Sequence, residues 1–510
     1  MSESSSPWAW IRLKDLVENM CLGKMLDKAK NQGTLKPYLG NINVRWFAFD
    51  LTELKEMRFE DDEVTRFSLR VGDLVVCEGG EPGRASVWSG QMDCMMIQKA
   101  LHRIRFYPEV YEPRFGMYFL FYGTTTNRFA EFYTGTTIKH LTGTALSDVL
   151  FPLPPLPEQH RIVEKIEELF SDLDAGVASL ERAKVNLKRY RASVLKSAVE
   201  GRLTAEWRKE HPQAEDGGLL LDRILRERRE KWEKDQLLKF KEKGKEPPKN
   251  WQSKYEEPSA PDTSEFPELP EGWVWARVDQ VAPPTGGLTK NPNRGSFKRK
   301  LPYLRVANVY SNELRLVELE EIGVEDDELE RLLLCKGDLL VVEGNGSKDQ
   351  IGRVAVWDGS IEPCVHQNHI IKARPAHGMS LWMLYFLISP NGRTSIEEVA
   401  SSTSGLYTLS ISKVASLPVP LPPLAEQEQI VALVEERLSQ IDSAEKTIDS
   451  ELIRSKRLRQ SILKRAFEGK IVPQDPKDEP ASVLLERIKA SRDAEQPKKK
   501  AKKATKVKAK

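Results

Sequence analysis

The chain of 510 residues is 40% hydrophobic and 30% charged, which is typical of a water-soluble protein with room for about three or four domains. Its 78 basic and 76 acidic residues leave a net charge of only +2, which excludes a uniformly basic nucleic-acid binder. The last fifteen residues hold eight lysines and no acid, so the rest of the chain carries a charge of −6. That part could bind a polyanion only through local patches.

Cysteine usage and the lack of apolar segments predict the compartment. Five dispersed cysteines without a CxxC pair indicate reduced thiols rather than a disulfide framework. The N-terminal sequence MSESSSPWAW has neither the basic nor the apolar region of a secretory signal. The longest apolar run, 381–388, is too short to cross a bilayer. We therefore expect a cytoplasmic protein without membrane contact.

The first segment, residues 1–150, mixes short β-branched runs such as 73–77 with glycine-rich turns, as compact mixed α/β domains do. Its early part is basic, and the acidic run 60–63 follows. The candidate DNA-binding side chains of this segment are basic, amide or hydroxyl groups in predicted loops: Lys24, Lys28, Lys36, Arg84, Gln98, Thr136 and Lys139.

Residues 151–203 form the second segment, which begins with a proline-rich lead-in and then holds no helix breaker except Gly176 for roughly forty residues. Apolar or small residues recur there at alternating intervals of three and four, which is the spacing of a coiled-coil seam. At 1.5 Å per residue such a helix is about 60 Å long. An ordinary core helix is the alternative, but few of these exceed 25 residues. The seam residues are Leu169, Leu173, Leu180, Leu187 and Val194, and the same stripe includes Gly176 and Tyr190.

Residues 204–268 are charged and then rich in proline. The part from 218 to 240 predicts an exposed basic helix, and the part from 245 to 270 predicts a linker.

From residue 269 onward the chain repeats itself. Residues 419–471 match 151–203 at 22 of 53 positions, and residues 269–418 match 1–150 more weakly. The second helix keeps a less regular stripe that includes Ile441, Ile448 and Ile462, together with Val434 and Leu458. A further helix over 472–495 and a disordered lysine-rich tail over 496–510 complete the prediction.

The second variable segment repeats the charge pattern of the first, with a basic stretch before the acidic run 325–328. Basic loops at the same place in both copies favour a surface for DNA phosphates, whereas solvated loops with incidental lysines are the alternative. The candidate residues here are Lys290, Lys298, Arg299, Lys300, Ser347, Lys348, Arg353, Gln367, Asn368, Ser404 and Tyr407. Gln367 aligns with Gln98, and amide side chains can pair with adenine in the major groove.

Motifs for catalysis and metal binding are absent from the sequence. It holds no GxSxG, HExxH or Walker sequence, and the glycine-rich turn at 344–348 lacks the Gly-Lys-Ser/Thr of a P-loop. It also lacks the Asp/Asn-Pro-Pro-Tyr/Phe with which amino-methyltransferases hold a flipped base. Cys364, His366 and His369 lie close together, but alternation along a strand would separate them and a fourth ligand is missing. We predict no catalytic residue and no metal site.

Several motifs resemble those of one known family, the specificity subunits of Type I restriction–modification systems. They are Leu-Pro-Glu-Gly-Trp-Val-Trp at 269–275, Pro-Leu-Pro-Pro-Leu-Xaa-Glu-Gln before both long helices, Phe-Glu-Gly-Lys-Ile-Val-Pro-Gln-Asp-Pro at 467–476, and Glu-Pro-Ala-Ser-Val-Leu-Leu-Glu-Arg-Ile at 479–488. The likeness covers residues 5–495. The first variable segment departs from it, because it begins with Ser-Pro-Trp-Ala-Trp and lacks the Leu-Pro-Glu-Gly lead.

The resemblance implies an α+β fold, in which two mixed α/β target recognition domains are joined by two conserved helices that form an antiparallel coiled coil with a pseudo-two-fold repeat. It also implies a non-catalytic subunit that recognises a bipartite, asymmetric double-stranded DNA target. Two modification methyltransferase subunits would bring S-adenosylmethionine for adenine N6 methylation, and restriction subunits would bring ATP and Mg²⁺. This chain would bind no cofactor itself. The alternatives are a stand-alone methyltransferase or nuclease, and a coiled-coil scaffold without sequence preference.

Overall fold

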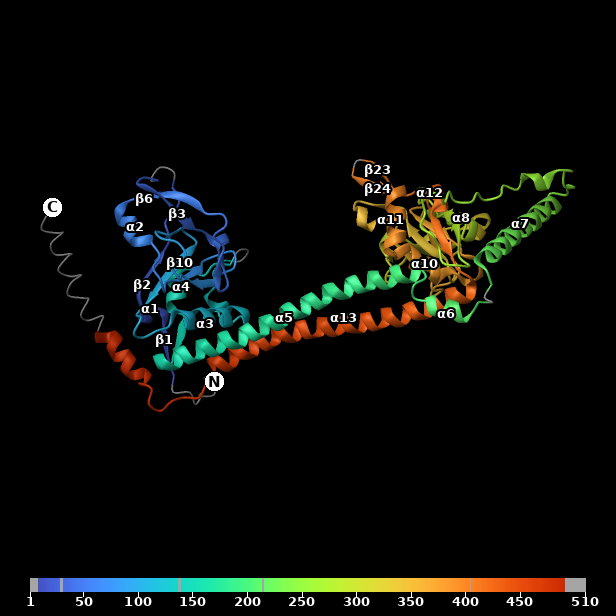
Figure 1. Ribbon diagram of the computed structural model, residues 1–510. Coiled ribbons are helices and arrows are strands. Elements are labelled where there is room, and N and C mark those ends of the chain that lie inside the picture. The colour runs from blue at the N-terminus through green and yellow to red at the C-terminus, as the bar shows by residue number, and fades with distance from the viewer. Residues whose placement is uncertain (1–7, 28–30, 136–138, 213–214, 404, 491–510) are drawn as a thin grey trace. The chain divides into compact units, whose positions relative to one another are not determined.

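A computed structural model describes residues 8–27, 31–135, 139–212, 215–403 and 405–490 (Figure 1). The chain divides into two compact units: unit 1 comprises residues 1–181 and 449–510, and unit 2 comprises residues 182–448. The boundary falls inside two 44-residue helices, α5 (Leu156–Val199) and α13 (Leu424–Phe467). Each unit therefore holds one recognition-type domain and one end of each long helix.

Unit 1 is built on a four-stranded sheet in the order β2-β10-β7-β8, with a three-stranded sheet β6-β3-β9 and the pair β1-β11. Its elements are β1 (Ala9–Arg12), α1 (Leu13–Leu16), β2 (Val17–Leu22), β3 (Thr34–Leu39), β4 (Val44–Arg45), β5 (Ala48–Phe49), β6 (Lys55–Phe59), α2 (Asp61–Phe67), β7 (Leu74–Cys77), β8 (Ala85–Val87), β9 (Met96–Ile97), β10 (Leu101–Phe106), α3 (Pro113–Thr125), α4 (Gly143–Asp148) and β11 (Leu150–Leu153).

Unit 2 repeats these sheets in the orders β13-β22-β18-β20, β17-β14-β21 and β12-β25, and adds a small sheet β19-β24-β23. Its elements are α6 (Ala205–Glu210), α7 (Gly217–Glu242), β12 (Val274–Arg277), α8 (Val278–Val281), β13 (Pro284–Gly286), β14 (Lys300–Leu304), β15 (Val309–Tyr310), β16 (Glu313–Leu314), β17 (Glu320–Gly323), α9 (Leu329–Leu332), β18 (Leu339–Val342), β19 (Gly344–Asn345), β20 (Val354–Val356), β21 (Val365–His366), β22 (Ile370–Ala373), α10 (Ser380–Ile388), α11 (Pro390–Val399), β23 (Ser401–Thr403), β24 (Leu406–Thr408), α12 (Ile411–Ser416) and β25 (Pro418–Leu421).

The central strand of each main sheet is buried on both faces. In β7, Leu74 and Val76 join one apolar cluster while Val75 and Cys77 join another. Successive side chains of a strand point to opposite faces, so a four-residue apolar run supplies both cores. The strand β18 does the same for the two main clusters of unit 2.

The repeat extends to individual hydrogen bonds. Arg103 donates to the carbonyl oxygens of residues 66 and 68 at 2.8 and 2.9 Å, and Lys372 donates to those of residues 331 and 333 at 2.6 and 3.0 Å. The Trp8 indole donates to Glu158 and the Trp273 indole to Glu426, at 3.1 and 2.8 Å. The predicted α+β architecture with two similar domains and two long helices packed together is confirmed.

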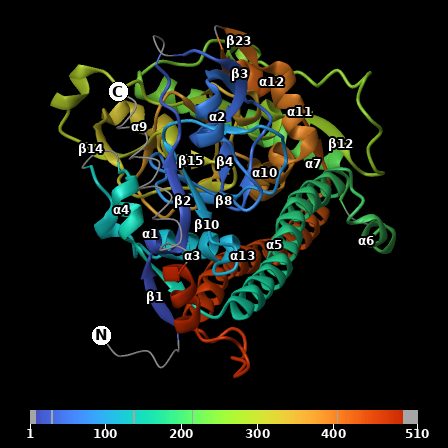
Figure 2. The same cartoon turned by 90° about the vertical axis from the view of Figure 1, so that its left-hand side faces the viewer.

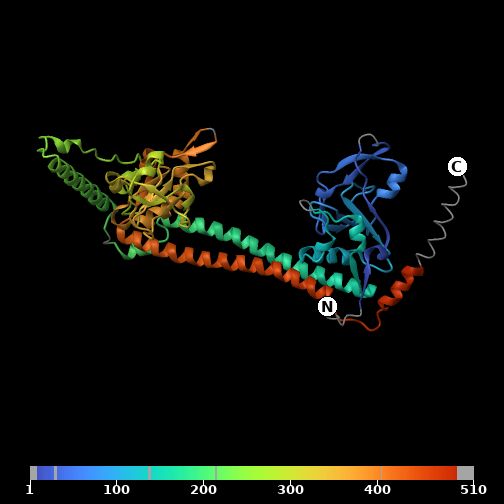
Figure 3. The same cartoon turned by 180° about the vertical axis from the view of Figure 1, so that it is seen from behind.

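The long helices run antiparallel, because unit 1 contains the first part of α5 and the last part of α13. They lie side by side in both units (Figures 1 and 3). In unit 2 Arg191 donates to Asp442 at 2.5 Å and to Glu445 at 3.0 Å, while in unit 1 Arg459 pairs with Asp174. Both partners of one pair are 268 positions from those of the other, which is the offset of the sequence repeat. The two ion pairs are therefore copies of each other.

The seam differs from the predicted stripe at three positions. Gly176 is exposed, and Tyr190 and Leu458 are 46% and 49% exposed, while their neighbours Val177, Arg191 and Arg459 are half-buried. A 3.5-residue repeat can be placed one position earlier or later and still include a similar number of apolar residues. Polar seam residues such as arginine do not help to place it, because they are not counted as apolar. Of the seam residues named above, Leu169, Leu173, Leu180 and Leu187 are half-buried, and Val194, Ile441, Ile448 and Ile462 are buried.

The helix α7 is tied to the proline-rich segment that follows it. Its Leu220 and Ile224 belong to the core of unit 2, and the Trp232 ring stacks on Trp251 with centroids 5.8 Å apart. The sequence predicted only an exposed helix and a linker. In unit 1, residues 481–490 are helical, and Leu484 and Ile488 are buried in its core. The remainder of the predicted C-terminal helix and the lysine-rich tail lie outside the described residues. None of the helices that the structure describes is long and apolar enough to span a membrane.

Candidate nucleic-acid interface

Three loops that are distant in the sequence meet in unit 1. The Asn41 amide donates to the carbonyl oxygen of Gly79 at 2.9 Å, and the Arg84 guanidinium donates to the carbonyl oxygen of Asn41 at 2.8 Å. A Cβ at Gly79 would lie 2.9 Å from Nδ1 of His140, so this third loop approaches closely enough that a side chain at residue 79 would displace the His140 ring. The glycine turn, Asn41 and His140 thus lie together.

The corresponding loops of unit 2 form a small sheet. In it Gly344 pairs with Thr408, and Asn345 pairs with Tyr407, while β23 adds hydroxyl side chains on the other edge of β24. The N–H of Leu409 donates to the carbonyl oxygen of Glu343 at 2.7 Å, as the N–H of Leu141 does to that of Glu78 at 2.7 Å. The structure therefore brings the glycine-rich turn of each copy next to a second loop, at His140 in unit 1 and at Tyr407 and Thr408 in unit 2.

The two aligned glutamines occupy equivalent places. The N–H of Gln98 donates to Leu39 at 3.0 Å, and that of Gln367 donates to Leu304 at 2.9 Å. Cβ atoms at Gly23 and Gly287 would lie 2.3 Å from the Gln98 and Gln367 carbonyl oxygens, so the backbone just after β2 or β13 passes close to each glutamine at a glycine. Both glutamine side chains are half-buried. Asn368, also half-buried, follows the second one, and its N–H donates to Leu288 at 3.0 Å.

Several of the predicted phosphate-binding cations are instead held by acidic residues. Lys24 is 7% exposed and its ammonium lies 2.5 Å from Glu63, over the Phe59 ring. The Arg84 side chain, 13% exposed, pairs with Glu81 as well as with Asn41. The charges of Lys24 and Arg84 are thus engaged inside the fold, and their role in DNA binding stays a prediction.

In unit 2 the ion pairs are more exposed. Lys290 lies 3.2 Å from Glu320, Arg299 lies 2.9 Å from Asp326, and Lys348 lies 3.7 Å from Glu397. Lys298 and Lys300 are exposed and make no ion pair with any described residue, and they line a hollow with the acidic segment 325–327. The basic stretch and the acidic run are thus neighbours, and two lysines of this stretch keep unpaired charges.

The remaining candidates are scattered over the same loops. In unit 1, Lys36 is half-buried on β3, and the exposed Lys139 lies 5.9 Å from the centre of the Tyr133 ring. In unit 2, the Ser347 hydroxyl donates to Asp349, and Tyr407 is half-buried. Lys28, Thr136 and Ser404 lie outside the described residues.

An aromatic and arginine stack was not anticipated from the sequence. Two guanidinium groups contact the Tyr310 ring, Arg315 at 3.8 Å and Arg353 at 5.0 Å from its centre. A tyrosine two residues after Asn308 carries no distinctive signal in one sequence, because its partners come from elsewhere in the chain, just after β16 and just before β20. Arg353 was a candidate, and its stacking holds the guanidinium in place beside β15.

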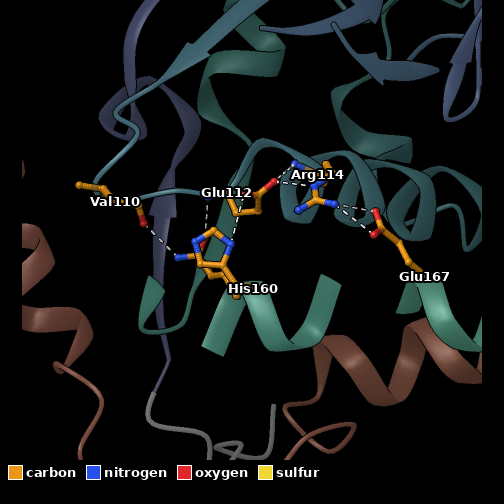
Figure 4. A network of polar contacts seen from close by, with 6 residues as sticks. Val110, Glu112, Arg114, His160 and Glu167 are labelled. Atoms are coloured by element: carbon orange, nitrogen blue, oxygen red, sulfur yellow. Dashed lines mark hydrogen bonds and ion pairs between the residues drawn. The ribbon is translucent and has the colours of Figure 1, made fainter. Parts of the chain in front are cut away.

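The recognition-type domain of unit 1 is fastened to α5 by a polar network (Figure 4). The N–H of Glu112 donates to Gln159 at 2.8 Å, and the Gln159 amide donates to the carbonyl oxygen of Val110 at 3.0 Å. The Glu112 carboxylate lies 3.3 Å from His160 and 2.9 Å from Arg114, which also pairs with Glu167 at 3.1 Å. These contacts join the start of α3 to the first turns of α5.

Buried titratable groups in unit 2 serve the fold. Burial lowers the pKa of His366 to about 4 and that of Lys372 to about 8. The Nδ1–H of His366 donates to the carbonyl oxygen of Ile370 at 3.0 Å, and His369 lies at the surface 2.8 Å from Glu343. Within the described part of the chain, no group of three metal-ligating side chains comes together.

The sequence of this chain is similar to one protein family and to individual specificity subunits. Residues 88–181 and 270–453 match the family described as "Type I restriction modification DNA specificity domain". The specificity subunit of the Type I restriction enzyme EcoKI of Escherichia coli K12 is 28% identical over 383 residues, which are 72% of this chain and 69% of that protein. The specificity subunit of EcoBI from Escherichia coli is 27% identical over 440 residues, which are 83% of this chain and 80% of that protein.

Two solved structures share the fold. One comes from a study of complex assembly and conformational transition of the type I R-M system, with a TM-score of 0.63 at 19% identity over 91% of this chain and 98% of that chain. The other is the HsdS subunit from Thermoanaerobacter tengcongensis, with a TM-score of 0.55 at 18% identity over 92% of this chain and 100% of that chain.

Proposed function

Because this chain belongs to the Type I restriction modification DNA specificity family and is a non-catalytic specificity subunit, we propose that it selects a bipartite, asymmetric DNA target and positions partner subunits there. The partners are two adenine-N6 methyltransferase subunits and the restriction subunits. In this proposal S-adenosylmethionine binds the modification subunits, ATP and Mg²⁺ bind the restriction subunits, and the whole complex acts in the cytoplasm.

One observation carries the bipartite, asymmetric target. The two domains share backbone hydrogen bonds but differ in the side chains at equivalent loop positions, such as His140 beside Gly79 and Thr408 beside Gly344. A shared scaffold favours the same mode of docking for both domains, whereas different side chains favour different base sequences. Two unlike domains on one chain would therefore read two unlike half-sites.

DNA contacts are assigned to the groups that the fold leaves available. Lys298, Lys300, Lys36 and Lys139 are proposed to contact phosphates. The amide, hydroxyl and guanidinium groups beside the glycine turns are proposed to lie against the bases or to hold the backbone: Gln98, Gln367, Asn368, Ser347, Arg353 and Tyr407.

The duplicated helices support the stoichiometry of the partners. The ion pair between Arg191 and Asp442 has a copy between Arg459 and Asp174. The part of the helix pair in unit 1 and the part in unit 2 therefore carry the same side chains at equivalent positions. A surface that repeats in this way can bind two identical subunits equivalently. This supports two modification subunits per chain.

The test is a genome-wide map of methylated adenines in host cells with and without this gene. We expect one split, asymmetric motif to lose its methylation in the deletion strain and to regain it on complementation. A continuous or palindromic motif, or no difference between the strains, would reject the proposal.

Two further measurements address the alternatives. Transfer of label from S-adenosylmethionine to DNA by the purified chain alone would favour a stand-alone methyltransferase. Competition between a target duplex and a random duplex, in the complex with its modification subunits, should favour the target by at least a hundredfold, since specific protein–DNA complexes exceed non-specific ones by about a thousandfold or more. Equal competition would favour a scaffold without sequence preference.

A further inference from the structure

A hollow of about 350 Å³ lies in unit 1 outside the surface described above. It is lined by residues of the neighbouring strands β2 and β10 and by residues at and after the end of α2. Figure 2 labels these three elements. Four arginines line it: Arg66, Arg70, Arg103 and Arg105. Such a concentration of guanidinium groups around one concave site is a feature of sites that bind phosphate.

The floor of the hollow is a fixed positive charge. Arg103 is 3% exposed, and its terminal nitrogens donate to the carbonyl oxygens of Arg66 and Ser68 and, at 2.6 Å, to Asn19. Neutral acceptors hold this guanidinium without cancelling its charge. Its Nε is buried and has no hydrogen-bond partner among the described residues. Arg105 lies beside it and is neutralised by two hydrogen bonds of 2.7 Å to Asp73.

The rim carries charges that are still available. Arg66 and Arg70 are exposed, and within the described residues neither guanidinium makes a hydrogen bond or an ion pair. The Arg66 guanidinium lies 5.1 Å from the centre of the Phe67 ring, a contact that leaves its N–H groups unused. Among the described residues Glu18 is the one carboxylate that lines the hollow, and Asp73 pairs with Arg105, so four arginines stand against two carboxylates.

The equivalent place in unit 2 is arranged differently. Lys372 and Arg374 replace Arg103 and Arg105 with the same carbonyl and aspartate partners. Arg331, the counterpart of Arg66, donates across the strands to the carbonyl oxygen of Gly286 at 2.9 Å, and Cys335 stands where unit 1 has Arg70. The shared fold therefore does not require the free arginines of unit 1.

We propose that this hollow is a phosphate-binding site of unit 1, with Arg66 and Arg70 as the binding residues and Arg103 as the fixed charge beneath them. Phosphate suits the site because its several oxygens can accept hydrogen bonds from more than one guanidinium at once. The group can come from the DNA backbone or from a free phosphate ion. The site itself does not depend on the function proposed above.

The test uses the full chain and inorganic phosphate as the probe. Thermal unfolding is followed while phosphate replaces chloride at constant ionic strength, in the wild type, in Arg66→Ala/Arg70→Ala and in Lys55→Ala/Lys239→Ala. The control removes two exposed lysines that make no ion pair among the described residues, so it matches the loss of charge. We expect phosphate to stabilise the wild type and the control, with an apparent affinity at least tenfold weaker in the arginine variant. Equal stabilisation of all three proteins would overturn the proposal.

A second measurement separates the two sources of phosphate. In the complex with modification subunits, the slope of log K for DNA against log salt falls by about 0.9 for each lost phosphate contact. If the slope is smaller in the arginine variant and the preference for target over random duplex is retained, the phosphate comes from the DNA backbone. An unchanged slope together with lost stabilisation by inorganic phosphate identifies the free ion. Loss of target preference in the wild type would instead count against the proposed function and leave the site untouched.

Discussion

At the scale of single residues, long-range ion pairs decide which cations remain available. The basic and acidic runs of each variable segment are separated by about thirty residues in the sequence, yet Lys24 contacts Glu63 and Arg294 contacts Glu328. The cause is antiparallel pairing, because β3 pairs with β6 and β14 pairs with β17. A positively charged stretch in a sequence therefore overstates the positive charge of the surface.

Lys298 and Lys300 are expected to carry the phosphate contacts of this stretch. Replacing both with alanine should weaken DNA binding by the complex and reduce the salt slope by roughly two, at about 0.9 per contact. Arg299→Ala is the matched control, since Asp326 already neutralises that guanidinium and the slope should change by less than one. An unchanged slope in the lysine variant would remove this surface from the interface.

His366 should make unit 2 sensitive to acid. Its pKa in the folded protein is about 4, below the ordinary value of 6.5, because the ring is buried. Between these values the unfolded chain binds a proton that the folded chain does not, so stability falls as the pH is lowered from 6.5 towards 4. From pH 7 to pH 5 the loss should be about 2 kcal/mol.

The measurement is hydrogen–deuterium exchange of the amides of β18 and β22 at both pH values. His366→Gln retains a polar group but does not titrate, so its loss of protection between pH 7 and pH 5 should be smaller by about 2 kcal/mol. The same pH dependence in both proteins would show that other groups cause it.

The residues of the candidate interface were only partly predictable. The glycine turns and the two glutamines could be found, because each recurs at the same place in both copies of the repeat. The roles of Asn41 and Tyr310 could not, since each depends on partners from other loops: Asn41 bonds Gly79, and Tyr310 stacks on Arg353.

At the scale of elements, polar residues in the seam distinguish this helix pair from an apolar zipper. Arg191 and Arg459 occupy half-buried positions between apolar neighbours, and each reaches acidic residues of the other helix. Polar residues at such positions fix which residues of two helices lie opposite each other. Apolar spacing alone predicted the two helices but not the seam positions of these arginines, because the arginines interrupt the hydrophobic pattern.

The ion pair at Arg191 can be tested by charge reversal. Arg191→Asp places a third negative charge beside Asp442 and Glu445 and should cost about 1 kcal/mol of stability, as expected for a partly exposed pair. Arg191→Asp/Asp442→Arg should restore most of that loss. The readout is the urea denaturation midpoint of the full chain.

Arg189→Asp provides the control for this experiment. Arg189 is exposed on the same helix and makes no ion pair with any described residue. Its reversal should change stability by less than half of the Arg191→Asp effect. If the two single variants lose equal stability, the seam pair has no particular role.

At the scale of the whole molecule, duplication explains why so much could be predicted. The hydrogen bond from the Trp8 indole to Glu158 recurs as the one from Trp273 to Glu426. The repeat therefore preserves the way in which each domain joins its long helix. Differences between the copies then mark places where the fold does not dictate the residue, as in the free arginines of unit 1. The tie between α7 and the proline-rich segment has no copy among the described residues, and no repeat pointed to it.

The proposed function gives the long helices a measurable role as a spacer between half-sites. Four residues inserted into both helices, after Glu181 in α5 and after Ile448 in α13, lengthen each by about 6 Å. At 3.4 Å per base pair this is close to two base pairs. Both insertions fall outside the packed cores of the two domains, since residues 181 and 448 border the division between the units. We therefore expect unchanged half-sites separated by a gap that is about two base pairs longer, read from the map of methylated adenines.

The same four residues inserted after Gly244, in the segment that follows α7, should leave the gap unchanged. A constant gap in the helix variant, with methylation retained, would mean that the distance between half-sites is set by the partner subunits instead of by this chain.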